Sequence, residues 1–415
     1  MNCRFQQLQN SINLIEFFDC KDIKMGDVFH YSFKEKISDK EILNSIVRII
    51  RNCFFNRIEY NIKGIPKTIM FYSSSYRERK EHFDAFNKVC LTLSDYVEFF
   101  PGKIKVSSNI KSLKNCFIWG KQLKKIGIDW RKKIYLVSVI QQAYCDYYIV
   151  EKTCKNNNFF IKNGVTLCDV MPIDSFFVQK WKSLGLRTIT LQHGTFNVGH
   201  YGYASSISDY FFAHSEFSVV CAVKSGLDRR KIVVVGAPQN INIERDYDDS
   251  NYKIIGVILG GTILEKYDIQ LLQMINVFAQ KYGFKVYAKF HPGFPLKKYS
   301  ESIEEYIDKE YYDEISCYEF MKFVDFLVDD GSTVFIECLQ NRKVAFTYLC
   351  EINPYKYDKN IFLTFESYDE MEKLFCMYID NSEEIKYMIE QNIKYLGTKE
   401  NPFELYKQAF ENYLI

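Results

Sequence analysis

Short apolar runs rich in β-branched and aromatic residues alternate along this chain with longer stretches whose apolar residues recur at helical spacing. In the first half, the runs are KTIMFYS, GVTLCDV, RTITLQHG, DYFFAHS and KIVVVGAP, and the helical stretches are YRERKEHFDAFNKVC, IDSFFVQKWKSLG and EFSVVCAVKSGL. Strands that alternate with helices form βαβ units, which build parallel sheets. The alternation therefore predicts an α/β fold with a parallel sheet.

The same alternation begins again after a polar, acidic segment without apolar periodicity. The second set of strands is KIIGVILGG, KVYAKFHPG, DFLVDDG and VAFTYL, with helices DIQLLQMINVFAQKYG and STVFIECLQN and a helical stretch near SIEEYIDKEYY. A chain of 415 residues also exceeds the size at which one core keeps growing. We predict two Rossmann-like, doubly wound parallel-sheet domains facing a central cleft. The predicted parts are an N-terminal domain at 1–240, a linker at 241–252, a C-terminal domain at 253–385, and C-terminal helices packing near the hinge at 386–415.

Composition excludes several classes of protein. The net charge of +2 gives no overall basic excess, so we expect no nucleic-acid partner. The 13 cysteines form an odd set without a C-x-x-C pair, and the first residues lack the order of a signal peptide, so we expect a reducing, cytoplasmic location. No apolar run approaches the roughly 20 residues that a membrane-spanning helix needs.

Two segments that follow strands of the second domain suit a nucleotide phosphate, because open parallel sheets bind ligands outside the carboxyl ends of their strands. In KFHPGFP, His291 can donate a hydrogen bond to a phosphate oxygen, while Pro292 and Gly293 turn the backbone. In VDDGSTVFIECL, Ser332 and Thr333 open a helix, where free amides, hydroxyls and the helix end form an anion site. A loop-bracing histidine and an ordinary N-cap are the structural alternatives.

A pair of glycines marks a third strand end. Gly260 and Gly261, followed by Thr262, lie between a strand and a helix, and glycines there permit close approach to a donor. The full G-x-G-x-x-G pattern is absent, which argues against a nicotinamide cofactor.

The fourth strand end lies in the first domain, in TITLQHGTFN. A histidine at a strand tip suits the removal of a proton from an acceptor hydroxyl, so His193 is the candidate catalytic base. Gln192, Gly194 and Thr195 are the candidate acceptor-side residues around it. The alternative is again a histidine that braces its loop.

Taken together, TLQHGTF, HSEFS, VVVGAPQ, KFHPG and DDGSTVFIECL resemble bacterial GT-B glycosyltransferases of capsule, O-antigen and teichoic acid synthesis, over about residues 164–350. The most similar groups are the CDP-glycerol glycerophosphotransferases and the bacterial sialyl- and polysialyltransferases. The resemblance implies that His291, Ser332 and Thr333 contact a cytidine nucleotide and that His193 is the base. The resemblance also implies that Glu337, one helical turn beyond Thr333, reaches a ribose hydroxyl, as acidic residues do in many GT-B enzymes, and the alternative is a side chain that faces solvent. The acidic motif that supplies the base in the sialyltransferases has no match in the first domain.

Two acidic pairs have side chains of the kind that bind metal ions. Asp246 and Asp248 fall in the predicted linker, and Asp329 and Asp330 are adjacent instead of spaced as D-x-D. We therefore expect no metal site and no cofactor, with a nucleotide-activated sugar as the substrate and with helix ends, His291 and hydroxyls in place of a metal's charge.

One local charge excess stands out. Residues 103–133 contain ten Lys or Arg and one acid, Asp129, with aromatic residues interspersed. Such a stretch suits peripheral contact with an anionic membrane face, a lipid diphosphate or an acidic glycan, and the alternative is a solvated basic face.

The sequence thus favours a glycosyltransferase. It would move a sugar or polyol phosphate from a nucleotide-activated donor, CMP- or CDP-linked, to a cell-surface polysaccharide or a lipid-linked acceptor. A nucleotide-sugar epimerase of the same architecture and a non-catalytic glycan-binding or assembly protein are the alternatives.

Overall fold

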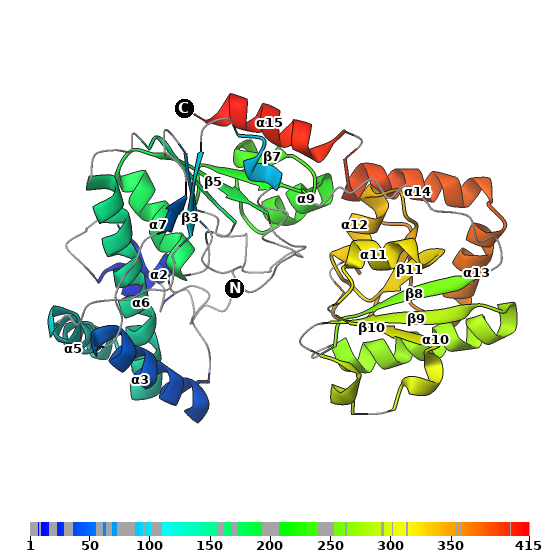
Figure 1. Ribbon diagram of the computed structural model, residues 1–415, viewed down its shortest axis with the longest axis horizontal. Coiled ribbons are helices and arrows are strands. Elements are labelled where there is room, and N and C mark those ends of the chain that lie inside the picture. Colours follow the sequence, from blue (N-terminus) through cyan, green and yellow to red (C-terminus); the bar gives the residue numbers. More distant parts are fainter. Residues whose placement is uncertain are drawn as a thin grey trace.

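The computed structural model contains two β-sheets that lie side by side (Figure 1). The strand order is β1-β3-β2-β4-β5-β6-β7 in the first sheet and β10-β9-β8-β11-β12-β13 in the second. The structure describes residues 7, 10–15, 23–28, 36–54, 61–63, 69–72, 88–93, 96–100, 110–155, 161–167, 169, 172–192, 207–238, 253–261, 264–291, 294–300, 302–312, 314–353, 355–356, 358–398 and 400–414. The predicted linker, 241–252, lies outside these ranges.

The first sheet is parallel except at one edge, where β1 pairs with β3 in the antiparallel sense. Its strands are β1 (Asn61–Lys63), β2 (Ile69–Tyr72), β3 (Tyr96–Phe100), β4 (Asn163–Thr166), β5 (Arg187–Leu191), β6 (Tyr210–Ala213) and β7 (Ile232–Val234). Helix α7 (Pro172–Ser183) packs on β4 and β5. Its Trp181 is fully buried, and a Cβ at Gly164 would meet the Trp181 ring at 2.2 Å. Gly164 in β4 therefore leaves the space that this indole ring fills.

Several helices at one end of the first half were not predicted from the sequence. Helices α3 (Asp39–Phe54), α5 (Ile110–Lys125) and α6 (Trp130–Lys155) pack on one another, and α7 and the short α2 (Met25–Val28) adjoin them. They form an apolar cluster of their own, which includes Leu123 and Ile140. Figure 1 shows α3 and α5 at the end of the first half that is remote from the second sheet.

The second sheet is parallel throughout and has the strand order of a Rossmann fold. Its strands are β8 (Ile254–Leu259), β9 (Lys285–Phe290), β10 (Lys309–Tyr311), β11 (Phe326–Asp329), β12 (Ala345–Tyr348) and β13 (Thr364–Phe365). Counted along the chain, the order across the sheet is 3-2-1-4-5-6. The predicted α/β class with two Rossmann-like parallel sheets is confirmed. The helix expected near 302–312 is wrong, because that segment forms a 3-10 turn at Glu304–Tyr306 and then β10.

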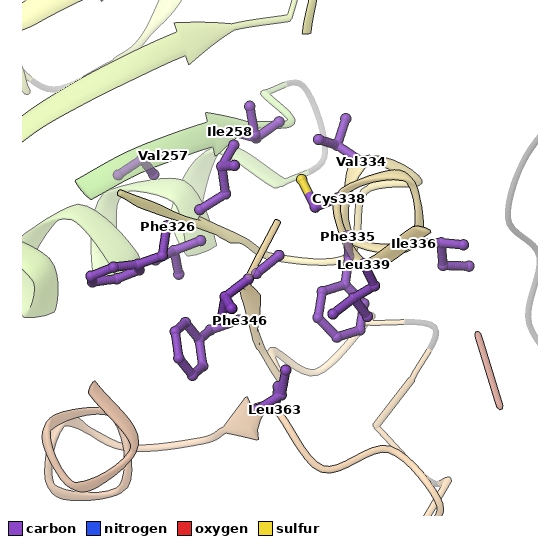
Figure 2. Packing of buried hydrophobic residues seen from close by; sticks show 14 of the residues in the cluster. Val257, Ile258, Phe326, Val334, Phe335, Ile336, Cys338, Leu339, Phe346 and Leu363 are labelled. Carbon is purple, nitrogen blue, oxygen red and sulfur yellow. The ribbon is translucent and has the colours of Figure 1, made fainter. Parts of the chain in front are cut away.

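Aromatic side chains fill the core of the second half. Phe326 of β11 contacts Phe346 of β12 with ring centroids 5.5 Å apart, and Phe375 of α13 (Tyr368–Ile379) lies 4.8 Å from both. Figure 2 shows Phe326 and Phe346 among the buried side chains, together with Cys338 and Leu339 of α12 (Val334–Gln340). Burial of this much apolar surface fixes α12 against β11 and β12. Helices α10 (Glu265–Tyr282) and α11 (Cys317–Lys322) complete this half.

The C-terminal helices connect the two halves. Helix α14 (Glu383–Leu396) packs on α12 and also on α9 (Glu216–Lys224) of the first half, where the rings of Phe217 and Tyr395 lie 6.1 Å apart. Helix α15 (Pro402–Tyr413) returns to the first sheet, where Phe410 lies 5.4 Å from Phe212. Among the described helices, none is long and apolar enough to cross a membrane.

Candidate functional site

Three of the segments predicted to bind a donor meet at the carboxyl edge of the second sheet. Strand β8 lies between β9 and β11, so the loops that follow these three strands are neighbours. Gly260 follows β8, His291 follows β9, and Gly331 begins the turn after β11. The order of the strands changes direction between β8 and β11, which is the place where open α/β sheets bind ligands. Thr262, Pro292 and Gly293 lie outside the described residues.

Asp268 in the first turn of α10 joins these loops. The backbone N–H groups of Gly260 and Gly261 donate to its two carboxylate oxygens at 3.0 and 2.7 Å. The hydroxyl of Tyr299, from the loop after β9, donates to the same carboxylate at 2.6 Å. Asp268 is fully buried. A single carboxylate therefore fixes the loop after β8 and ties it to the loop after β9.

Asp330, directly after β11, brings the third loop to the same place. It is 1% exposed, and no donor in the described part of the chain reaches either of its carboxyl oxygens. Burial, with the Asp268 and Asp329 carboxylates beside it, raises the pKa of Asp330 well above its ordinary value. Two carboxylates cannot hydrogen-bond to each other, but a protonated Asp330 can donate to Asp268. A proton held by Asp330 beside the Asp268 carboxylate would link β11 to the loop after β8.

The turn after β11 is held by the neighbouring carboxylate, Asp329. The backbone N–H groups of Gly331 and Ser332 donate to Asp329 at 3.3 and 3.1 Å, and the Ser332 hydroxyl accepts from the N–H of Val334 at 3.2 Å. The sequence predicted free amides here, but these amides have partners within the chain. Helix α12 has only seven residues. The Thr333 hydroxyl makes no capping bond to this helix.

The pKa of the Asp329 carboxyl is also raised. Its complete burial raises its pKa to about 7, although hydrogen bonds from Thr347 and from the turn amides act in the opposite direction. Asp329 therefore faces the turn, whereas Asp330 faces Asp268. The described residues include no group of three side chains that could hold a metal ion. Asp246 and Asp248 are outside them.

Gly260 and Gly261 are required by packing within the chain. A Cβ at Gly260 would meet the Leu264 side chain at 2.3 Å, and a Cβ at Gly261 would meet the Phe294 side chain at 2.5 Å. Gly261 also has a φ of +57°, which disfavours other residues. The sequence predicted that these glycines permit close approach of a donor. The structure shows that packing against Leu264 and Phe294 also requires glycine at the two positions.

His291 is exposed at the end of β9, and the loop that follows it lines a hollow that the sequence did not predict. The N–H of Phe294 donates to the His291 carbonyl at 2.8 Å and closes a turn. The loop that follows forms, with Tyr312 after β10, a hollow of about 500 Å³. Its lining residues are Pro295, Leu296, Lys297, Tyr299, Ser300, Ser302, Ile303, Glu304 and Tyr312. This volume is in the range of small-molecule sites.

Two tyrosines give the hollow fixed walls. Tyr299 is held by its bond to Asp268, and Tyr312 stacks on Phe290 of β9 with ring centroids 5.2 Å apart and an interplanar angle of 17°. Lys297 adds a positive charge, and Ser300 and Ser302 add hydroxyls. Aromatic walls with a few polar groups suit a nucleoside or a sugar. The sequence signal for this wall is the run FPLKKYS, which begins three residues after His291.

Glu337 lies one turn into α12, where its N–H donates to the Thr333 carbonyl at 3.2 Å. Its side chain is half-buried. Glu337 and Thr333 therefore share the same end of α12, as the sequence predicted from their spacing.

The carboxyl edge of the first sheet holds the other predicted segment. Gln192 follows β5 and is 1% exposed, and its side-chain carbonyl accepts from the N–H of His214 at 2.8 Å. The Nε2 atom of His214 lies 2.8 Å from the Gln192 backbone carbonyl. Gln192 and His214 thus tie the ends of β5 and β6 together. His214 is not among the site residues predicted from the sequence. His193, Gly194 and Thr195 lie outside the described residues.

Comparison with known proteins defines the fold. No protein-family model matches the sequence, and no curated protein matches it. The structure is similar to UDP-GlcNAc 2-epimerase from Neisseria meningitidis bound to UDP-GlcNAc, with a TM-score of 0.52 and 12% identity over 83% of this chain and 98% of that one. It is also similar to HepE from Anabaena in complex with UDP and glucose, with a TM-score of 0.51 and 10% identity over 83% and 98%. The two Rossmann-like halves therefore have the GT-B fold.

Proposed function

We propose that this protein is a GT-B enzyme that uses a nucleotide-activated sugar and transfers the sugar, or a polyol phosphate, to a surface glycan or a lipid-linked acceptor. The observation that carries the proposal is the carboxyl edge of the second sheet. There, Asp268 ties the loops after β8 and β9 together, the turn after β11 follows the adjacent strand, and the loop after β9 lines a hollow with two tyrosines and Lys297.

In this proposal the nucleotide lies along that edge. The base or ribose enters the hollow beside Tyr299 and Tyr312, and the phosphates lie toward His291 and Lys297. The hydroxyl of Thr333 and the carboxylate of Glu337 contact the rest of the donor. Positive and hydrogen-bonding groups would stabilise the negative charge that develops on the leaving nucleotide.

The acceptor is proposed to bind to the first half, where His193 removes a proton from its hydroxyl. Part of the basic stretch at 103–133 forms α5, whose Lys114, Lys121, Lys124 and Lys125 are exposed. Because α5 lies at the end remote from the second sheet, these cations suit the distant part of a long anionic acceptor and not its reacting hydroxyl. Closure of the two halves would bring donor and acceptor together and exclude water.

A nucleotide screen tests the donor site. We expect melting of the protein to shift upward with at least one of CMP, CDP, UDP and GDP. The resemblance of the sequence favours the cytidine nucleotides, whereas the structural neighbours were solved with UDP or a UDP-sugar. Lys297→Ala should reduce the shift, and Lys298→Ala should leave it unchanged, because Lys298 is equally exposed but does not line the hollow. Absence of any shift in the wild-type protein would contradict the proposal.

An epimerase is the second candidate, since the fold is similar to that of a UDP-GlcNAc 2-epimerase. An epimerase converts its nucleotide sugar without an acceptor. Incubation with donor alone, followed by analysis of the sugar, distinguishes the two: an altered sugar supports the epimerase, and an unchanged sugar supports the transferase.

Substitution of the two histidines separates the roles of the two halves. His193→Ala and His291→Ala should each abolish turnover, and only His291→Ala should weaken nucleotide binding. Wild-type turnover in both variants would show that neither histidine has the proposed role.

A further inference from the structure

Helix α3 exposes an apolar face to solvent. Leu43, Ile46, Val47, Ile50 and Phe54 are 62%, 38%, 54%, 46% and 46% exposed. They occupy positions i, i+3, i+4, i+7 and i+11, which is the spacing of a single stripe along a helix. Isolated exposed apolar residues are common, but a continuous stripe of five large ones marks an interaction surface.

The other side of α3 is fixed to the protein. Ile42, Ser45, Asn52 and Cys53 are buried, and α3 packs along α6. The helix is therefore ordered by its own core contacts, and its exposed stripe is not needed to hold it in place.

Basic side chains border the apolar stripe. Lys40, Arg48 and Arg51 are exposed on α3, on the side of the stripe away from the buried face. The two acids in the first turn are engaged within the chain. Asp39 pairs with Arg131 at 2.8 Å, and Glu41 accepts from the N–H and the hydroxyl of Ser38 at 2.9 Å. The cations that border the stripe thus face solvent beside apolar side chains.

The neighbouring helix α5 has a similar exposed surface. Phe117 and Ile118 are 68% and 43% exposed, and α5 contains no acidic residue. Its exposed lysines lie at helical spacing with these two residues: Lys114, Lys121, Lys124 and Lys125. Because α3 packs against α5, both surfaces belong to the same end of the molecule (Figure 1).

We propose that α3 docks on an anionic lipid bilayer, with its apolar stripe in the headgroup and acyl boundary and its basic residues on the lipid phosphates. A helix that combines an apolar face with flanking Lys and Arg binds in the plane of such an interface. Each basic residue near an anionic membrane surface adds electrostatic attraction to the lipid phosphates. This docking depends on no residue of the proposed donor site.

A second copy of the chain fits this surface less well. Pairing two such stripes would bring the cations of both copies into one interface, whereas Asp39 and Glu41 already have partners. An anionic surface complements these charges, and a copy of the same surface does not.

Vesicle sedimentation tests the docking. We expect the full-length protein to bind vesicles of phosphatidylcholine with 30% phosphatidylglycerol, and to bind pure phosphatidylcholine weakly. Leu43→Gln/Val47→Gln/Ile50→Gln should lower the partition coefficient by roughly tenfold or more, because burial of each apolar side chain is lost. The triple variant Lys40→Gln/Arg48→Gln/Arg51→Gln should lower the partition coefficient on the anionic vesicles and leave it unchanged on pure phosphatidylcholine.

Val277→Gln is the matched control, since Val277 is 53% exposed on α10 of the other half. It should bind vesicles like the wild type. Unchanged melting temperatures would show that the variants fold. Failure of the wild type to bind anionic vesicles, or equal binding by the α3 apolar variant, would overturn the proposal. The proposal would also be overturned if the wild type were a dimer in solution and the apolar variant a monomer, because the stripe would then be the interface between two copies of the chain.

Discussion

At the scale of single residues, the candidate donor site depends on buried acids that the sequence did not reveal. His291, Gly260 and Ser332 could be placed at strand ends because a strand end is a local feature of the sequence. Asp268 and Asp330 meet only because α10 and β11 come together in the fold, and no spacing in the chain predicts such a contact. For the same reason the turn amides were expected to be free, although Asp329 accepts their hydrogen bonds.

The acidic cluster predicts how stability depends on pH. Burial raises the pKa values of Asp268, Asp329 and Asp330, and that of Asp329 rises from 3.8 to about 7. Between these two values the folded chain holds a proton that the unfolded chain releases. The contribution of Asp329 to stability is therefore greatest in acid and is lost as the pH rises from 3.8 toward 7, and Asp268 and Asp330 act in the same direction.

Asp330→Asn tests the shared proton. The amide is similar in shape, stays neutral, and can donate to Asp268 at every pH. We expect the variant to melt above the wild type at pH 8 by at least about 2 °C, with the difference shrinking toward pH 5. Melting curves at the two pH values measure this, and the same pH dependence in both proteins would contradict a proton shared between Asp268 and Asp330.

Gly261→Ala tests the packing beneath the loop after β8. The new Cβ would meet Phe294 at 2.5 Å and would also carry the strain of a φ of +57°. Gly283→Ala is the control, because Gly283 has a φ of +71° and nothing within 4 Å of its Cβ position. We expect a cost of about 1 kcal/mol for the control and about 2 kcal/mol or more at Gly261, measured by chemical denaturation. Equal costs would show that Phe294 moves aside freely.

At the scale of elements, the strands of both sheets with long apolar runs were predicted, as were α7, α9, α10, α12, α14 and α15. Periodicity identifies such elements because each buries one continuous face. The short β10 was mistaken for a helix, since its three residues carry too little pattern and it is defined by pairing with β9. Helix α3 was missed. Helix α3 has apolar residues on its exposed face as well as on its buried face. Its apolar residues therefore do not mark the single buried face by which a helix is recognised in a sequence.

Helix α15 gives a prediction at this scale. Phe410 is 2% exposed and packs on Phe212 of the first sheet. Phe410→Ala should destabilise the protein by about 3 to 5 kcal/mol and release α15 from the sheet. Limited proteolysis should then cut the chain near residues 397–401 faster. The exposed Glu411→Ala on the same helix should leave the rate unchanged. An unchanged rate in Phe410→Ala would show that α15 is held by other contacts.

At the scale of the whole molecule, two sheets of similar design are joined through helices that both halves share. One apolar cluster includes Phe217 of α9 together with the core of the second sheet, and Phe217 contacts Tyr355 at 5.3 Å as well as Tyr395. The last helix then returns to the first sheet. In the proposed function the donor binds to one half and the acceptor to the other, while α3 and α5 lie at the end of the first half that is remote from the second sheet (Figure 1).

Hydrogen–deuterium exchange with and without the nucleotide that stabilises the protein tests the central claim most directly. Binding at the carboxyl edge of the second sheet predicts slower exchange at residues 258–261, 291–304 and 331–337, with no change in α3 or α5. Protection confined to the first half, or no protection at these three segments despite saturating nucleotide, would contradict the proposed donor site.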